Sequence, residues 1–207
     1  KEDPKPSETK QATKLVPLTK ENAKPEATKP VTQPNNEIWY TSSDGKVVKP
    51  RDVFGAEIES NTYKNGKGII KFKGDVTTIG YYAFYNCDSL TSVTMPNSVT
   101  TIGMSTFYGC DNLLNVILSE NLTEIGNNVF AYCYELNDIT LPNSLIKIGE
   151  WAFAYCRELE SITLPDGLTT IGERAFMGCD SLVSVTIPNS VTELSEGAFS
   201  YCDNLVE

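Results

Sequence analysis

The side chains of this chain best suited to chemistry are six cysteines, which recur at a fixed interval of 23 residues: Cys87, Cys110, Cys133, Cys156, Cys179 and Cys202. A thiolate can act as a nucleophile or bind zinc. Structural zinc sites usually take their sulfur ligands from close pairs such as Cys-x2-Cys, which this spacing does not provide. The chain contains no histidine, so Ser-His and Cys-His catalytic pairs are excluded.

The even number of cysteines would fit a set of disulfides. Their regular spacing instead predicts a ladder of identical side chains from equivalent backbone positions, about 4.8 Å apart if the repeats stack as neighbouring strands. Parallel side-chain directions fit the disulfide torsion near 90° poorly. We therefore predict buried, reduced thiols that pack as small hydrophobic groups, with disulfide bridges as the alternative.

Four aspartates directly follow cysteines and align at the same interval: Asp88, Asp111, Asp180 and Asp203. Calcium takes roughly six to eight oxygen ligands, whereas Tyr134 and Arg157 interrupt this column. We predict that the aspartates accept hydrogen bonds from nearby backbone groups. We expect neither a metal nor a cofactor.

One serine nucleophile motif is present. Residues 144–147 match S-x-x-K, the nucleophile motif of penicillin-binding enzymes, but the companion motifs KTG and SDN are missing. Ser98 and Ser190 occupy the same repeat position as Ser144, which indicates a turn residue. We predict no catalytic residues and no enzyme, although catalysis by carboxylates is not excluded by composition alone.

The elements that position these side chains repeat with the same period from Val76 to the end of the chain. Each cysteine follows a phenylalanine by three residues, at Phe84, Phe107, Phe130, Phe153, Phe176 and Phe199. A unit of this length cannot bury its own apolar side chains and must stack on its neighbours. The sequence therefore predicts a solenoid of about six units over residues 76–207, the last one incomplete.

Residues 90–110 illustrate one unit. Leu90, Val93 and Met95 recur in the following units as a short strand with inward apolar side chains. Pro96 and its equivalents end this strand, except in the unit that carries Ser119. A recurrent glycine at Gly80, Gly103, Gly126, Gly149 and Gly172 indicates a corner that a β-carbon would hinder, and Ser195 replaces it in the last unit.

The segment between the phenylalanine and the cysteine predicts a single helical turn, because residues three apart share one face of a helix. Each coil would then run strand, corner, extended segment, corner, helical turn. The expected fold class is an α/β repeat solenoid with short parallel strands.

The outward strand positions form the candidate binding surface. These side chains are small, polar and mostly uncharged, and they alternate with the inward residues: Ser92, Thr94, Asn115, Ile117, Asp138, Thr140, Ser161, Thr163, Ser184 and Thr186. Aromatic side chains near the turns form a second group, of which Tyr82 and Trp151 are the expected exposed members because their equivalents are not aromatic. Tyr132, Tyr155 and Tyr201 recur 23 residues apart or at multiples of it, and are expected to stack as a packing ladder.

The chain begins with two segments outside the repeats. Residues 1–36 contain six of the eleven prolines and predict an extended or disordered spacer. Residues 37–75 predict a β-rich N-terminal cap of two hairpins, one turning at Asp44-Gly45 and one at Asn65-Gly66. Terminal units of a solenoid are expected to differ from the others because they cover its open end.

The repeat pattern L-x-x-[VI]-x-[LMI]-P-x-x-[VL]-x-x-I-G-x-x-[AV]-F-x-x-C resembles the BspA-type leucine-rich repeat over about two thirds of the chain. This resemblance implies a right-handed, curved solenoid and export to the bacterial cell surface. In some members it implies adhesion to host matrix proteins or to other microbes. The family has no common catalytic residues, so the resemblance implies none here.

Charge limits the partners further. Residues 37–207 carry a net charge of −12, which disfavours nucleic acid and anionic membrane surfaces. We expect a protein partner, such as host extracellular matrix or another microbe, bound by a non-catalytic module that is secreted or attached to the cell surface. Attachment to a membrane would need a tether outside the given sequence. A glycan-binding or glycan-processing accessory protein is the alternative, because aromatic and paired acidic side chains also suit sugars.

Overall fold

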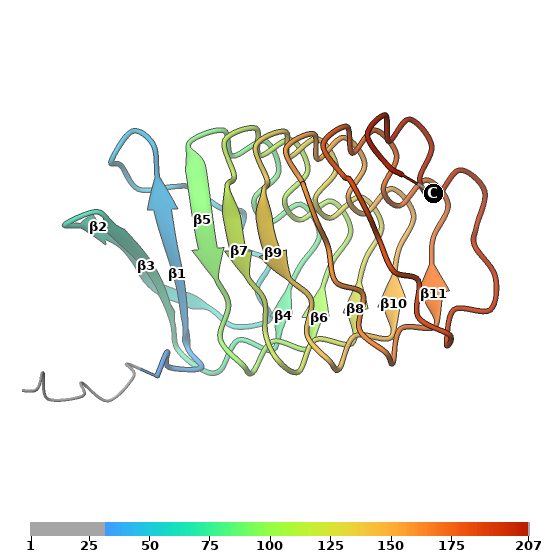
Figure 1. The fold of residues 1–207 in the computed structure, drawn as a ribbon. Helices are drawn as coiled ribbons and strands as arrows, with labels where there is room; N and C mark the ends of the chain where they lie inside the picture. The colour runs from blue at the N-terminus through green and yellow to red at the C-terminus, as the bar shows by residue number, and fades with distance from the viewer. Residues whose placement is uncertain (1–31, 207) are drawn as a thin grey trace, which may run out of the picture. The chain divides into compact units, whose positions relative to one another are not determined.

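The computed structural model describes residues 32–206, so nearly all of the predicted spacer lies outside the described residues. Gln33 begins the unit that contains every strand. A first sheet has the strand order β2-β3-β1-β5-β7-β9, with β1 Glu37–Ser42, β2 Ile58–Lys64, β3 Lys67–Phe72, β5 Leu90–Thr94, β7 Asn115–Ile117 and β9 Asp138–Thr140. Figure 1 shows these strands along one side of the stacked coils.

A second sheet runs along the other side of each coil. Its order is β11-β10-β8-β6-β4, with β4 Thr78–Ile79, β6 Thr101–Ile102, β8 Glu124–Ile125, β10 Lys147–Ile148 and β11 Thr170–Ile171. All of its pairs are parallel, and each joins residues 23 apart, such as Ile102 and Ile125. The repeats therefore form a parallel-strand β-solenoid with the predicted 23-residue period. Its strands pair over about four turns, fewer than the predicted six units.

The predicted α/β class is wrong in its helical part, because none of the described residues lies in a helix. In the turn after each glycine, alternate backbone N–H groups donate to the next coil and not to their own turn. Phe84 N donates to Thr106 O at 2.8 Å, and Asn86 N donates to Tyr108 O at 2.8 Å. Tyr82 and Asn86 also have positive φ, as do their equivalents in the other coils, which a helix does not allow.

The core of the solenoid is a continuous stack of phenylalanine rings. Ring centroids of successive phenylalanines, from Phe84 to Phe199, lie 5.1 to 5.4 Å apart with nearly parallel planes. Phe54 extends the aromatic core at the N-terminal end, where it packs against Phe72 at 5.0 Å and Phe84 at 5.8 Å. No coil encloses its own ring, so each coil needs both neighbours to remove its phenylalanine from water.

The cysteine ladder lies beside these rings. Cys110, Cys133, Cys156 and Cys179 are buried, and Cys87 and Cys202 at the two ends are half-buried. The thiols from Cys110 to Cys202 each donate to the phenylalanine carbonyl 26 residues earlier, at 3.0 to 3.2 Å. Burial raises the pKa of the Cys110, Cys133 and Cys156 thiols well above the usual thiol range. A hydrogen bond with Cys202, together with burial, raises the pKa of Cys179 in the same direction. These positions match the predicted packing role of the cysteines.

The corner residues also follow the prediction. Pro96, Pro142 and Pro165 are buried after the strand positions, and Ser119 is buried in their place in one coil. Ser119 Oγ donates to Asn97 O at 3.3 Å and accepts from Asn121 N at 3.1 Å. At Gly149 a β-carbon would lie 2.7 Å from the backbone of the preceding coil, so close approach of two backbones explains the glycine.

Residues 37–75 differ partly from the predicted pair of hairpins. The β2–β3 hairpin turns at Asn65-Gly66, as predicted, with both residues at positive φ. The chain also turns after β1, but Val47 and Val48 form no return strand. Instead β1 pairs antiparallel with β3 on one edge and with β5 on the other. The first predicted hairpin is therefore wrong, because the first repeat strand offers β1 a longer partner.

Replacing Phe130 with alanine is expected to lower the free energy of unfolding by about 3–5 kcal/mol, since the ring is fully buried between two others. Tyr82→Ala serves as the control, because this ring is only half-buried. Urea unfolding followed by circular dichroism measures both variants. An equal loss in the two would contradict the assignment of the phenylalanine column to the core.

Thiol labelling under native conditions is expected to reach the half-buried Cys87 and Cys202, and the other four cysteines only after unfolding. A hydrogen bond with Cys179 lowers the pKa of Cys202, so this thiol should be labelled faster than Cys87. Burial raises the pKa of Cys87 to about 11, so its labelling rate should rise as the pH approaches that value. Mass spectrometry of digested samples locates the label. Rapid native labelling of Cys133 would be incompatible with the packed ladder.

Candidate binding surface

The outward strand residues form two adjacent columns, as predicted. Ser92 pairs with Asn115 and Asn115 with Asp138, while Thr94, Ile117 and Thr140 pair in the neighbouring column. A bridge between Ser161 and Ser184 continues the first column beyond β9. Asp138, Thr140, Ser161, Thr163, Ser184 and Thr186 are exposed, while Ser92, Thr94 and Asn115 are half-buried. We call this set of outward residues the strand face.

Ile117 is the apolar exception on the strand face. Its side chain is 54% exposed although threonine occupies its equivalents Thr94, Thr140, Thr163 and Thr186. Burying an isoleucine gains roughly 1.5–3 kcal/mol, so an exposed one on the strand face offers an apolar contact to a partner.

Shallow hollows follow one another along this face. A hollow of about 460 Å³ is lined by Asn115, Ile117, Asp138 and Thr140 together with Asn143. Two similar hollows repeat it further along, lined in part by Thr140 and Thr163 and by Thr163 and Thr186. Their walls come from the residues that follow each strand, because the chain turns sharply at the proline. Neighbouring hollows share lining residues, such as Thr140 and Thr163, so they form a row across the coils.

Polar contacts hold the strand-face side chains in place. Asn115 Nδ2 donates to Asp138 Oδ2 of the next coil at 2.8 Å. At the N-terminal end, Thr41 Oγ1 lies 2.6 Å from both Thr91 Oγ1 and Ser92 Oγ. Such contacts reduce the conformational entropy that a partner would have to remove on binding.

The structure adds a patch that the sequence reasoning missed. Trp39 in β1 pairs with Thr94 on one side and with Ile69 on the other, so it extends the strand face past the first repeat. Lys67 Nζ lies 3.1 Å from the centre of the Trp39 ring, a cation–π contact. The alternation of Trp39 with the buried Ile38 and Tyr40 was the available signal. Only the pairing of β1 with β5 reveals which surface it joins.

Tyr82 and Trp151 lie at the turns, away from the strand face, and are half-buried. The Tyr82 ring packs edge-on against Tyr85 at 5.4 Å, and Arg51 lies over both rings. Arg174 lies over the Trp151 ring at 5.5 Å. The structure therefore does not bring these two residues together with the strand columns.

The expected tyrosine ladder forms only in part. Tyr132 and Tyr155 stack at 4.9 Å, as predicted, but Tyr201 is 73% exposed. Gly178 occupies the intervening position, and the Tyr155 ring covers the space where its β-carbon would lie. The gap leaves Tyr201 without the stacking partner that the ladder requires.

The side chains considered as possible catalytic groups instead form contacts that stabilise the fold. Ser144 Oγ donates to Glu120 O at 2.8 Å and to Leu122 O at 2.6 Å, and Lys147 pairs with Glu124 at 2.8 Å. The serine thus ties two coils together, as a turn residue does. Within residues 32–206 there is no group of three metal-ligating side chains, nor a helix able to cross a membrane.

Comparison with known proteins points to one family. The sequence model described as BspA type leucine rich repeat region matches residues 77–206 in six copies. The chain is similar to the crystal structure of a T. pallidum leucine rich repeat protein, with 39% identity, a TM-score of 0.64, and coverage of 66% of this chain and 64% of that one. No curated protein matches the chain.

Two further solved structures resemble the chain. A leucine-rich repeat protein from Bacteroides ovatus shares 36% identity, with a TM-score of 0.63 over 82% of this chain and 44% of that one. A leucine rich cell surface protein from Faecalibacterium prausnitzii shares 26% identity, with a TM-score of 0.55 over 87% of this chain and 55% of that one. The chain spans less than two thirds of the length of each of these three proteins.

Replacing Asn115 with aspartate is expected to lower the free energy of unfolding by roughly 0.2–1 kcal/mol at low salt, because it places two carboxylates opposite each other. The loss should shrink at about 1 M salt, where the screening length is about 3 Å. Asn115→Ala is the control, since it removes the hydrogen bond without adding charge. Equal salt dependence of unfolding in both variants would contradict the cross-coil contact.

Proposed function

Because this chain belongs to the BspA-type leucine-rich repeat family, we propose that it is a non-catalytic, surface-displayed module that binds a protein through its strand face. The family fits an interaction or adhesion role, and one similar structure is of a cell surface protein. The observation that carries the proposal is the row of hollows across the coils, with the exposed Ile117 lining one of them. The partner class is a protein of the host extracellular matrix or of another microbe.

We also propose that residues 37–75 act as the N-terminal cap of a right-handed coil. In support, β1 and β3 extend the strand face through antiparallel pairing, and Phe54 covers the first ring of the phenylalanine stack. A cap of this kind shields apolar surface that a regular repeat would leave exposed. The cap also carries Trp39 and Lys67 to the edge of the proposed binding face.

The test uses the whole chain immobilised on a biosensor and a panel of extracellular matrix proteins in solution. For any protein that binds, Ile117→Arg is expected to weaken the affinity by about ten-fold or more, since it places a charge where the partner would bury an apolar group.

Ile146→Arg is the matched control, because Ile146 is 50% exposed and precedes β10 in the other sheet. If Ile146→Arg weakens binding as much as Ile117→Arg does, the strand face is not the binding site. If no member of the panel binds, the partner is not one of these extracellular matrix proteins.

Glycan binding or processing is the alternative function. It is favoured by the half-exposed Trp151 and by the tyrosines at the turns, because aromatic rings stack against sugars. A glycan array tests it with the same chain. Strong binding of a sugar that is lost in Trp151→Ala, together with no binding to the protein panel, would replace the leading proposal with this one.

A further inference from the structure

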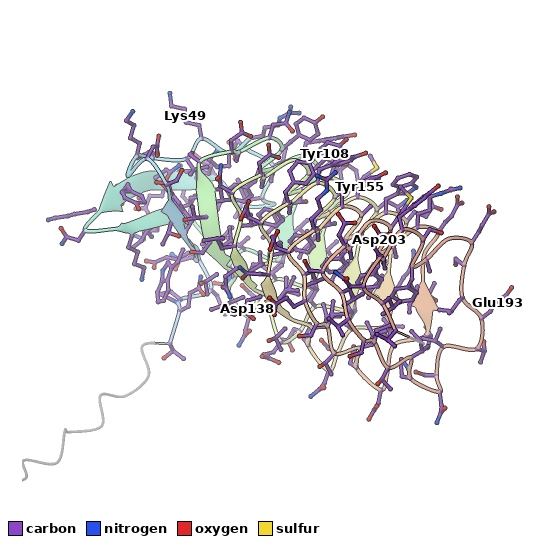
Figure 2. All side chains as sticks on the ribbon, turned by 45° about the horizontal axis from the view of Figure 1, so that its top comes forward. Lys49, Tyr108, Asp138, Tyr155, Glu193 and Asp203 are labelled. Carbon is purple, nitrogen blue, oxygen red and sulfur yellow. The ribbon has the colours of Figure 1, made fainter. Side chains whose placement is uncertain are left out.

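Another hollow, away from those of the strand face, lies at the turns, at the corner where the chain enters the strands of the first sheet. It has a volume of about 370 Å³, and its walls include Tyr108, Tyr132 and Tyr134. The rings of Tyr108 and Tyr132 lie 5.1 Å apart, and Tyr134 meets Tyr132 edge-on at 6.1 Å. Figure 2 labels Tyr108 and Tyr155 along this edge of the molecule, with Asp138 of the strand face away from them. We call this hollow the tyrosine corner.

Two carboxylates line the tyrosine corner. Asp88 and Asp111 occupy the same position in successive coils, one after each cysteine. Neither forms an ion pair with a cation of residues 32–206, although Lys147, Arg157 and Arg174 elsewhere on the surface do pair. Partial burial raises the pKa of Asp111, and the nearby charge of Asp88 raises it further.

The same column contains an arginine two coils after Asp111, beside an aromatic ring and a carboxylate. Arg157 follows Tyr134 in the same column, and its guanidinium lies 5.0 Å from the centre of the Tyr134 ring. Its Nε lies 3.6 Å from Asp180 Oδ2. An aromatic ring and a carboxylate thus hold a guanidinium there. At Asp88 and Asp111 the ring and the carboxylates are present, but that column supplies no arginine beside them.

We propose that the tyrosine corner binds an arginine side chain of a partner protein. A guanidinium is planar, stacks on aromatic faces and donates two parallel hydrogen bonds to carboxylate groups. Tyr108, Tyr132 and Tyr134 supply aromatic walls around the guanidinium, and Asp88 and Asp111 supply the acceptors. Arginine suits the site better than lysine, because an ammonium group is more strongly hydrated and cannot stack. The site is separate from the strand face and does not depend on its proposed function.

The test compares two short peptides, acetyl-Gly-Arg-Gly-amide and the same peptide with citrulline, which has nearly the same shape without the charge. Tyrosine ring signals of the whole chain are followed by NMR during titration. The arginine peptide is expected to shift the signals of Tyr108, Tyr132 and Tyr134 in a saturable way. The citrulline peptide should bind about ten-fold more weakly or not measurably.

The double substitution Asp88→Asn with Asp111→Asn is expected to weaken binding of the arginine peptide by about ten-fold or more. The matched control is Asp166→Asn with Asp203→Asn, which removes the same charge from exposed positions outside the hollow. Circular dichroism verifies the fold of both, and Asp111→Asn alone serves if the first double variant does not fold.

Three results would overturn the proposal. Equal weakening in both double variants would mean that only the overall negative charge attracts the peptide. Equal binding of the citrulline peptide would remove the role of the guanidinium. A neutral oligosaccharide that shifts the same ring signals, while the arginine peptide does not, would assign the hollow to a sugar. Ile117→Arg should leave peptide binding unchanged, so failure of the strand-face proposal is distinguishable from failure of this one.

Discussion

The constraint on which this structure depends is that no coil can bury its own phenylalanine. Each ring leaves water only when rings of the coils before and after it stack at a little over 5 Å. Every other inward feature follows from that spacing, including the thiols that donate to phenylalanine carbonyls and the glycines where backbones approach. Stability is therefore shared between neighbours, and outward side chains are free to vary without disturbing the stack.

Much of the fold follows from the sequence because the inward residues recur without a slip in register. Phenylalanine, cysteine, proline and glycine columns all lie where their spacing predicts. The helical turn was wrong because spacing alone cannot distinguish a helix from a turn whose N–H groups bond to the next coil. Phe84 N donates a hydrogen bond to the carbonyl of Thr106, which is 22 residues away in the sequence. The local sequence pattern does not show whether an N–H group will bond within its own turn or to the next coil.

The candidate surfaces were predictable only where they repeat. The strand-face columns follow from period-two alternation, and the structure pairs them in the expected register. Trp39 was missed because its place depends on an antiparallel pairing between segments more than 50 residues apart. Tyr201 was misjudged because Gly178 occupies the equivalent position one coil earlier, so the nearest tyrosine of the ladder, Tyr155, lies two coils away. The tyrosine corner combines three columns, so no single repeat position reveals it.

Family membership accounts for the scaffold but not for a partner, since one fold supports many binding functions. A surface of identical columns would bind an extended partner equally well in several positions, each shifted by one coil. Residues that break the repeat remove this ambiguity. Ile117 stands in a column of threonines, and Tyr134 and Arg157 stand in a column of aspartates. Specificity is a difference between competing arrangements. We therefore expect the departures from the repeat, and not the repeat itself, to set where a partner binds on this protein.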